Sequence, residues 1–127
     1  MVWHYKLKKR KKTGGKKRPY RTKRAHERGR YPIETELGDV KRKRVKENSG
    51  VPKTKIVSTN LVNVSNPDSG LTERLTIIDV VRNPANTDYN RRGVITKGTI
   101  IRTPKGLAKI VSRPGQTGSL NAVLFNE

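Results

Sequence analysis

Positive charge is concentrated at one end of this chain, and that asymmetry limits what the chain can fold into. Residues 1–30 hold 14 lysine and arginine residues against one acidic residue, Glu27, and so carry 13 of the 20 net positive charges. Three glycines and one proline interrupt them, and residues 6–30 offer few apolar side chains to bury. A block of like charge with so little to bury repels itself and does not build a core. We therefore expect residues 1–30 to be a basic, extended N-terminal tail that is disordered when free.

The charge of this tail predicts a polyanionic partner, and nucleic acid is the commonest one. The run Gly14-Gly15-Lys16-Lys17 superficially resembles a nucleotide-binding loop. It lacks the GxxxxGK[ST] spacing, and no apolar strand precedes it. The glycines instead suit a backbone that passes close to phosphate, with lysines on either side.

Residues 31–55 form a basic transitional segment with seven basic and four acidic residues. Four consecutive basic residues, Lys41, Arg42, Lys43 and Arg44, lie between Val40 and Val45. This run is compatible with an edge strand or with a loop, and in either form it presents a strongly basic face.

Residues 56–127 have the pattern of a small all-β domain. Valine, isoleucine and threonine suit pleated, partly buried strands, and clusters rich in proline, glycine and asparagine separate them. So short a segment seldom supplies two well-packed sheets, so we predict a small closed β-barrel of about six strands. No helical period stands out. The expected strands are Ile56–Val64, Thr72–Arg82, Gly93–Thr96, Thr99–Arg102, Leu107–Ser112 and Leu120–Phe125.

The candidate RNA-binding residues lie in the tail, in the basic run that follows it, and in one turn of the β domain. Lysine and arginine suit phosphate, and tyrosine and histidine can stack on unpaired bases. For Trp3 and Tyr31, anchoring the tail to the barrel is an equally weighted alternative to stacking on bases. The candidates are Lys8, Lys9, Arg10, Lys11, Lys12, Thr13, Gly14, Gly15, Lys16, Lys17, Arg18, Tyr20, Arg21, Lys23, Arg24, His26, Arg28, Arg30, Lys41, Arg42, Lys43, Arg44 and Arg113.

Other chemistry finds little support in the sequence. There are no cysteines and only two histidines, His4 and His26, so we expect no metal site and no cofactor. The acidic residues form no general acid/base pair, and Asp79 alone would make an incomplete catalytic site. No apolar run is long enough to span a membrane, and no secretory signal is evident. We expect a cytoplasmic protein that is not an enzyme, with no membrane partner and no small-molecule substrate.

Several separated motifs resemble the small-subunit ribosomal protein eight-e family of archaea and eukaryotes, and the archaeal version in particular. The tail carries KRKKTGGK at 9–16, RPY at 18–20 and KRAHERGR at 23–30. RLTIIDVVRN at 74–83, KGTIIRT at 97–103 and GLAKIVSRPGQTGSLNAVL at 106–124 follow in order. One departure is Arg28, where the family usually has an aliphatic residue between glutamate and glycine.

The resemblance implies a small β-barrel with a basic extension, docked on small-subunit ribosomal RNA. It predicts a structural constituent of the small ribosomal subunit, with neighbouring ribosomal proteins as further partners. A ribosome assembly factor of the same family is one alternative, although such relatives are typically longer. A chromosomal DNA-binding protein is the other alternative.

Overall fold

The computed structural model describes residues 10–18, 21–22, 24–27, 29–47 and 49–125. The chain divides into two compact units, Met1–Pro32 and Ile33–Glu127. The boundaries expected near residues 30 and 55 stay a prediction. In the second unit, residues 33–36 already bond to the β structure, because the Ile95 N–H donates to the Thr35 carbonyl at 2.8 Å.

The described part of the first unit contains a tight turn and one short helix. Arg10 and Lys16 form an antiparallel bridge. Between them, the Lys11 N–H bonds the Gly15 carbonyl at 2.8 Å, and the Gly14 N–H bonds the Lys11 carbonyl at 3.1 Å. Gly14 has φ +84°, the left-handed conformation that a three-residue hairpin loop needs at this position. Farther along, Ala25–Glu27 forms a turn of 3-10 helix.

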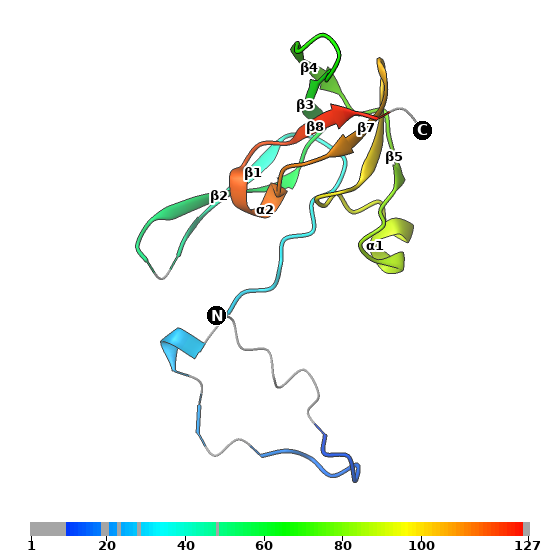
Figure 1. Cartoon of the computed structure of the whole chain (residues 1–127). Helices are drawn as coiled ribbons and strands as arrows, with labels where there is room; N and C mark the ends of the chain where they lie inside the picture. The colour runs from blue at the N-terminus through cyan, green and yellow to red at the C-terminus, as the bar shows by residue number, and fades with distance from the viewer. Residues whose placement is uncertain (1–9, 19–20, 23, 28, 48, 126–127) are drawn as a thin grey trace. The chain divides into compact units, whose positions relative to one another are not determined.

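The second unit is built from eight strands and two short helices (Figure 1). β1 and β2 form an antiparallel hairpin, and the other six strands form one sheet in the order β4-β3-β8-β7-β6-β5. The strands are β1 (Lys41–Lys46), β2 (Pro52–Ser58), β3 (Leu61–Ser65), β4 (Thr72–Thr76), β5 (Asp79–Arg82), β6 (Ile100–Thr103), β7 (Gly106–Ile110) and β8 (Asn121–Leu124). The helices are α1 (Thr87–Arg91) and α2 (Pro114–Thr117).

The connectivity forces the six-stranded sheet to curl. Its two edge strands, β4 and β5, are joined by only Ile77 and Ile78. Three Cα–Cα steps reach about 10 Å, whereas five strand spacings in a flat sheet span about 24 Å. The edges must therefore approach each other, and the sheet forms a half-barrel (Figure 1). The linker bonds to both sides: the Ile77 N–H donates to the Asn60 carbonyl and the Ile78 N–H to the Arg102 carbonyl.

The core lies inside this curl. Alternate residues of the central strands point inward, and these side chains are almost fully buried. Ile101 and Ala108 are 0% exposed, and Val62 and Ile110 are 1% exposed. Ile56 from β2 joins the same cluster, so the basic hairpin is attached to the half-barrel by a buried side chain.

The all-β prediction is confirmed, and the sheet contains six strands as expected. The sequence predicted a closed barrel, whereas the six-stranded sheet is open. Among the described residues, no backbone ladder joins its edge strands β4 and β5. The single strand expected over Ile56–Val64 is wrong. The chain turns at Thr59, whose N–H bonds the Glu36 carbonyl and whose hydroxyl bonds Leu61, so β2 and β3 belong to different sheets.

Three further expectations are corrected. The strand expected over Thr72–Arg82 is two strands, β4 and β5, which Ile77 and Ile78 separate and which lie at opposite edges of the sheet. Gly93–Thr96 is not a strand, because Ile95 makes only an isolated bridge to Thr35. Helices α1 and α2 were not predicted, and both are too short to show a helical period. Each helix begins at a local feature. In α1 the Asn86 side chain accepts a hydrogen bond from the Asp88 N–H, and in α2 Pro114 occupies the first turn, where its fixed φ favours a helix.

Candidate nucleic-acid interface

Strand β1 presents four consecutive basic side chains to solvent. Lys41, Arg42, Lys43 and Arg44 are all exposed, and only Val45 in this strand is buried. Val45 supplies an apolar anchor, and pairing with β2 fixes the strand. The sequence allowed this run to be an edge strand or a loop. The structure shows the edge strand, because β1 pairs with β2 alone.

The hairpin gathers more positive charge across its two strands. In the register of β1 and β2, Lys43 lies opposite Lys55, and Val45 lies opposite Lys53. The positive charge of Lys55 is compensated by an ion pair, because its Nζ lies 3.2 Å from Glu47 Oε1. Within the part of the chain that the structure describes, Lys41–Arg44 form no ion pair. Like charges across a strand pair destabilise it, and a bound polyanion reverses that effect.

Helix α2 packs beside the hairpin and brings Arg113 to the same region. Lys53 Nζ donates to Gln116 Oε1 at 3.2 Å. Gly118, at the end of the helix with φ +68°, approaches Thr54 so closely that an added Cβ would lie 3.0 Å from Thr54 Cβ. Arg113 occupies the N-cap position, is exposed, and makes no capping bond through its side chain. The geometry therefore leaves its guanidinium directed to solvent.

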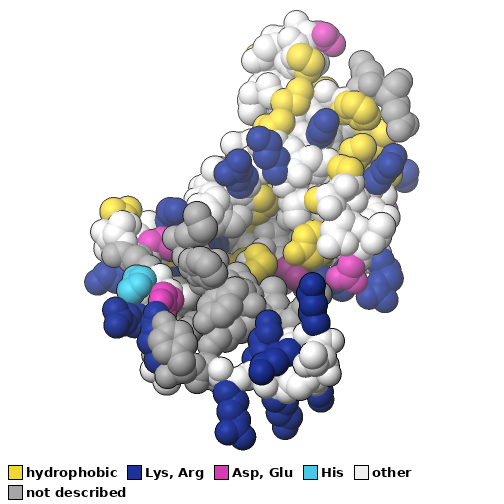
Figure 2. Space-filling view, turned by 60° about the horizontal axis from the view of Figure 1, so that its bottom comes forward, with side chains coloured by type: hydrophobic (Ala, Val, Ile, Leu, Met, Phe, Trp, Pro, Cys, Tyr) yellow, Lys and Arg dark blue, Asp and Glu magenta, His cyan; other side chains and the backbone are white. Residues whose placement is uncertain are grey.

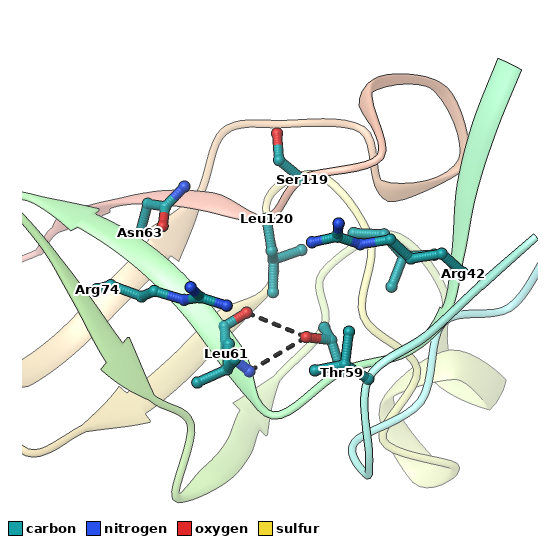
Figure 3. Close-up of a pocket in the computed structure, with 9 residues that line it drawn as sticks. Arg42, Thr59, Leu61, Asn63, Arg74, Ser119 and Leu120 are labelled. Carbon is teal, nitrogen blue, oxygen red and sulfur yellow. Dashed lines mark hydrogen bonds between the residues drawn. The ribbon is translucent and has the colours of Figure 1, made fainter.

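A cleft of about 200 Å³ lies between the hairpin, strands β3 and β4, and the segment that precedes β8. Arg42 enters it from β1 and Arg74 from β4, and their guanidinium groups point toward one another across Leu120 (Figure 3). Arg74 is exposed and lies opposite Asn63 in the β3–β4 register. The two arginines thus meet from segments more than thirty positions apart in the sequence.

The basic residues of the first unit surround the turn at Gly14. Arg10 donates from its guanidinium to the Gly14 carbonyl at 2.8 Å, which stabilises the turn. On the face shown in Figure 2, lysine and arginine side chains are scattered over the surface, with few aspartate or glutamate side chains between them. The exposed residues around this turn are Arg10, Lys11, Lys12, Thr13, Gly14, Gly15, Lys16, Lys17 and Arg18.

Glu27 is a local charge partner, and its partner is Arg21. The two Arg21 nitrogens donate to the two Glu27 oxygens at 2.6 and 2.5 Å, and the Arg24 N–H donates to Glu27 Oε2 at 3.1 Å. These bonds, with Arg21 first, hold the pKa of Glu27 at about 2 instead of its ordinary 4.5. Arg21 can therefore reach a phosphate only by exchanging this carboxylate for it.

A second ion-pair cluster fastens the start of the second unit to α1. Arg92 pairs with Glu34 and, at 2.9 Å, with Asp88. The hydrogen bond from Arg92 lowers the pKa of Glu34, and the bond from Arg91 lowers the pKa of Asp88. The Arg92 guanidinium also lies 5.6 Å from the centre of the Tyr89 ring. Because its charge is used internally, Arg92 is a structural residue.

The model of the ribosomal protein S8e family matches residues 4–125 of this sequence. The chain belongs to the ribosomal protein S8e family. The resemblance that the sequence motifs indicated is thereby confirmed.

Its relatives in the family include archaeal proteins named small ribosomal subunit protein eS8. The one from Methanosarcina barkeri is 46% identical over 116 residues, covering 91% of this chain and 93% of the relative. That from Halobacterium salinarum is 47% identical over 119 residues, covering 94% of each chain. That from Haloarcula marismortui is 43% identical over 115 residues, covering 91% of this chain and 92% of the relative.

The candidate residues of this S8e chain fall into two groups and a remainder. One group surrounds the Gly14 turn, and the other lies on β1, with Arg113 in the neighbouring loop. Arg24, His26 and Arg30 are exposed in the first unit. Lys8, Lys9, Tyr20, Lys23 and Arg28 lie outside the described residues, as do Trp3 and Tyr5. Tyr31 is 82% exposed.

The sequence does not single out Arg74 as a binding residue, because Arg74 lies inside the expected strand Thr72–Arg82. The alternation of Arg74 and Thr76 with the half-buried Leu75 could have placed its side chain outside the core. The sequence offers no signal for its approach to Arg42, since that depends on how the hairpin is attached.

The described residues contain no group of three or more histidines, aspartates and glutamates arranged to hold a metal ion. Asp79 is exposed and accepts from the neighbouring Val80 N–H at 2.7 Å, so its carboxylate serves the local backbone. Among the described helices none is long and apolar enough to cross a membrane.

Proposed function

We propose that this protein is a structural constituent of the small ribosomal subunit that binds small-subunit ribosomal RNA in the cytoplasmic ribosome. The exposed basic strand Lys41–Arg44, in a chain of the ribosomal protein S8e family, carries this proposal. Four adjacent cations without acidic partners in the described structure suit the phosphates of a nucleic acid. The function is binding and not catalysis.

Binding proceeds by exchange of counterions for side chains. Lysines and arginines of the hairpin and of residues 1–30 displace condensed cations from the RNA backbone. The tail, which when free keeps only local contacts such as the Arg21–Glu27 pair, takes one arrangement as it binds. The half-barrel fixes the register by its shape, with little reading of base edges. The protein thereby holds RNA helices together beside neighbouring ribosomal proteins.

The printed names of the matching relatives, small ribosomal subunit protein eS8, favour the structural protein over an assembly factor of the same family. The archaeal relatives match over 91–94% of this chain and 92–94% of their own length. The chain and these relatives are therefore of nearly equal length.

Sedimentation of cell lysate on sucrose gradients tests the proposal. The protein is expected to migrate with mature small subunits and to remain with them through a moderate salt wash. Migration with precursor particles alone would identify an assembly factor, and migration with chromosomal DNA would identify a DNA-binding protein. Either result would contradict the proposal.

A pair of matched variants tests the role of the hairpin in the same gradients. Lys41→Gln/Lys43→Gln removes two charges from β1, and Lys97→Gln/Lys109→Gln removes two exposed charges elsewhere in the unit. The first pair is expected to leave the subunit at lower salt than the second. Equal salt sensitivity would show that the number of charges matters and their place on β1 does not.

A further inference from the structure

The cleft between the hairpin and the half-barrel has the composition of a ligand site. Two arginines, Arg42 and Arg74, face each other across it (Figure 3). None of its lining residues is acidic. Two guanidinium groups directed at one space repel each other, and an anion placed between them is attracted by both. Arginine also offers paired N–H donors that match a phosphate.

The floor of the cleft is apolar, which free phosphate alone would not need. Ile56 is 2% exposed and Leu120 is 3% exposed, and Leu61 lies beside them at the start of β3. Thr59 does not compete for a ligand, because its hydroxyl is bonded to the N–H and carbonyl of Leu61 at 3.1 and 3.2 Å (Figure 3). A flat, weakly polar group can therefore rest on this floor.

An oriented amide stands at the edge of the cleft. Asn63 Nδ2 donates to Asn121 Oδ1 at 3.0 Å, which fixes the plane of the Asn63 side chain. That bond uses one of its two N–H groups, so the second N–H and the oxygen remain available as donor and acceptor. Cations, an apolar floor and one amide are the groups that hold an unpaired nucleotide, whose base can also stack on a guanidinium plane.

We propose that this cleft binds one unstacked nucleotide of a single-stranded stretch of RNA. Arg42 and Arg74 hold its phosphate, and its base lies over Leu61 and Leu120 within reach of Asn63. The volume of about 200 Å³ is below the roughly 300 Å³ at which pockets for drug-sized ligands begin, so the cleft takes no ligand larger than one nucleotide. This inference rests on the proposed function, since it names the kind of RNA that one part of the surface takes.

Methyl and side-chain amide NMR of the full chain tests the proposal, with single-stranded penta-adenylate RNA as the probe. The stacked ring is expected to shift the methyl signals of Leu61 and Leu120 and the Asn63 amide signal. A duplex RNA of the same length has no unpaired base and is expected to leave these signals in place. Inorganic phosphate is expected to move the arginine signals and not the leucine methyls.

Single substitutions assign the phosphate contacts. Arg42→Ala and Arg74→Ala are each expected to weaken penta-adenylate binding about tenfold or more, as the loss of a charged hydrogen bond implies. Arg74→Lys keeps the charge and is expected to fall between Arg74→Ala and the wild type. Arg102→Ala is the matched control, because Arg102 is an exposed strand arginine that does not line the cleft. Unchanged signals of distant core methyls establish that each variant is folded.

The outcomes separate this inference from the proposed function. If the full chain binds small-subunit RNA tightly while the leucine methyls respond to no single-stranded RNA, the nucleotide site is refuted and the proposed function stands. Arginine signals that shift with inorganic phosphate, together with leucine methyls that shift with no RNA, would indicate a phosphate site only and would likewise overturn the nucleotide site. If the full chain binds small-subunit RNA no better than it binds duplex DNA, the proposed function itself fails.

Discussion

Glu27 shows how one residue can adjust a strongly basic segment. It is the only acidic residue among the first 30, and Arg21 holds it through two short hydrogen bonds. Its pKa of about 2 means that the carboxylate stays charged through all physiological pH values. The Glu27 carboxylate therefore lowers the net positive charge of the tail by one at all of these pH values. It also accepts the Arg24 N–H at the start of the short helix.

The titration of this carboxylate is the first prediction. Because its pKa in the folded state is depressed, the pair stabilises the turn fully above pH 4.5 and is lost as pH falls toward about 2. Carbon NMR of the side-chain carboxyl is expected to show a midpoint near 2. Arg21→Ala should move this midpoint up toward 4.5, and Arg24→Ala should change it little, because Arg24 contributes its backbone N–H. A wild-type midpoint near 4.5 would show that the pair does not form in solution.

At the scale of elements, the loop after β7 is held against the hairpin by a glycine. Gly118 has φ +68°, and a Cβ there would lie 3.0 Å from Thr54 Cβ and 3.2 Å from the Thr54 carbonyl oxygen. Gly118→Ala therefore combines a left-handed conformation with overpacking and should lower the free energy of unfolding by roughly 2–4 kcal/mol. Gly115→Ala is the control, because nothing lies within 4 Å of its added Cβ and its φ is not positive.

Urea denaturation measures both variants. Gly115→Ala is expected to be near neutral or stabilising by less than about 1 kcal/mol. A loss in Gly118→Ala of only about 1–2 kcal/mol, the cost of the left-handed conformation by itself, would mean that the loop and Thr54 separate in solution. A larger loss, with Gly115→Ala near neutral, would indicate that α2 and the hairpin form one packed element.

The elements also show what the sequence could and could not predict. Alternation and turn residues placed the strands of the half-barrel well, because burial of one face dictates period two. They failed at Thr59, where the chain leaves the hairpin for the half-barrel while its residues still look like strand formers. They failed again at Ile77 and Ile78, where the expected strand Thr72–Arg82 divides into β4 and β5 at opposite edges of the sheet. They also failed to bring Arg42 and Arg74 together, since a tertiary contact between a hairpin and a sheet has no local signature. The positive charge of the interface, by contrast, is visible directly in residues 1–30 and 41–44.

At the scale of the whole molecule, we infer separate roles for the two units in the binding proposed above. Among the described residues, the buried core cluster lies within the second unit and runs from Ile56 to Ala122. Residues 1–30 supply 14 basic residues, and none of the described residues of the first unit belongs to that cluster. We infer that residues 1–30 provide affinity through charge, and that residues 33–125 provide the folded platform that sets where the charge is placed.

Deletion of residues 1–30 separates these roles. The shortened chain is expected to keep a dispersed β-sheet NMR spectrum, because its core is complete without them. If the full chain neutralises about 6–10 phosphates, its affinity for small-subunit RNA should fall roughly 10³–10⁵-fold between 50 and 200 mM salt. The shortened chain should bind weakly and respond far less to salt. An affinity that stays both high and salt-sensitive after the deletion would assign the binding to the hairpin instead.

A chain in which the sequence of residues 1–30 is shuffled is the control for this deletion. It keeps the net charge of the tail and loses the order in which its residues follow one another. Counterion release depends on the number of charges, so the salt dependence of the shuffled chain should match that of the wild type. Its affinity should fall only by what the ordered contacts around Gly14 and the Arg21–Glu27 pair contribute. If shuffling weakens binding as much as deletion does, the tail recognises a particular RNA shape, and charge alone does not explain its role.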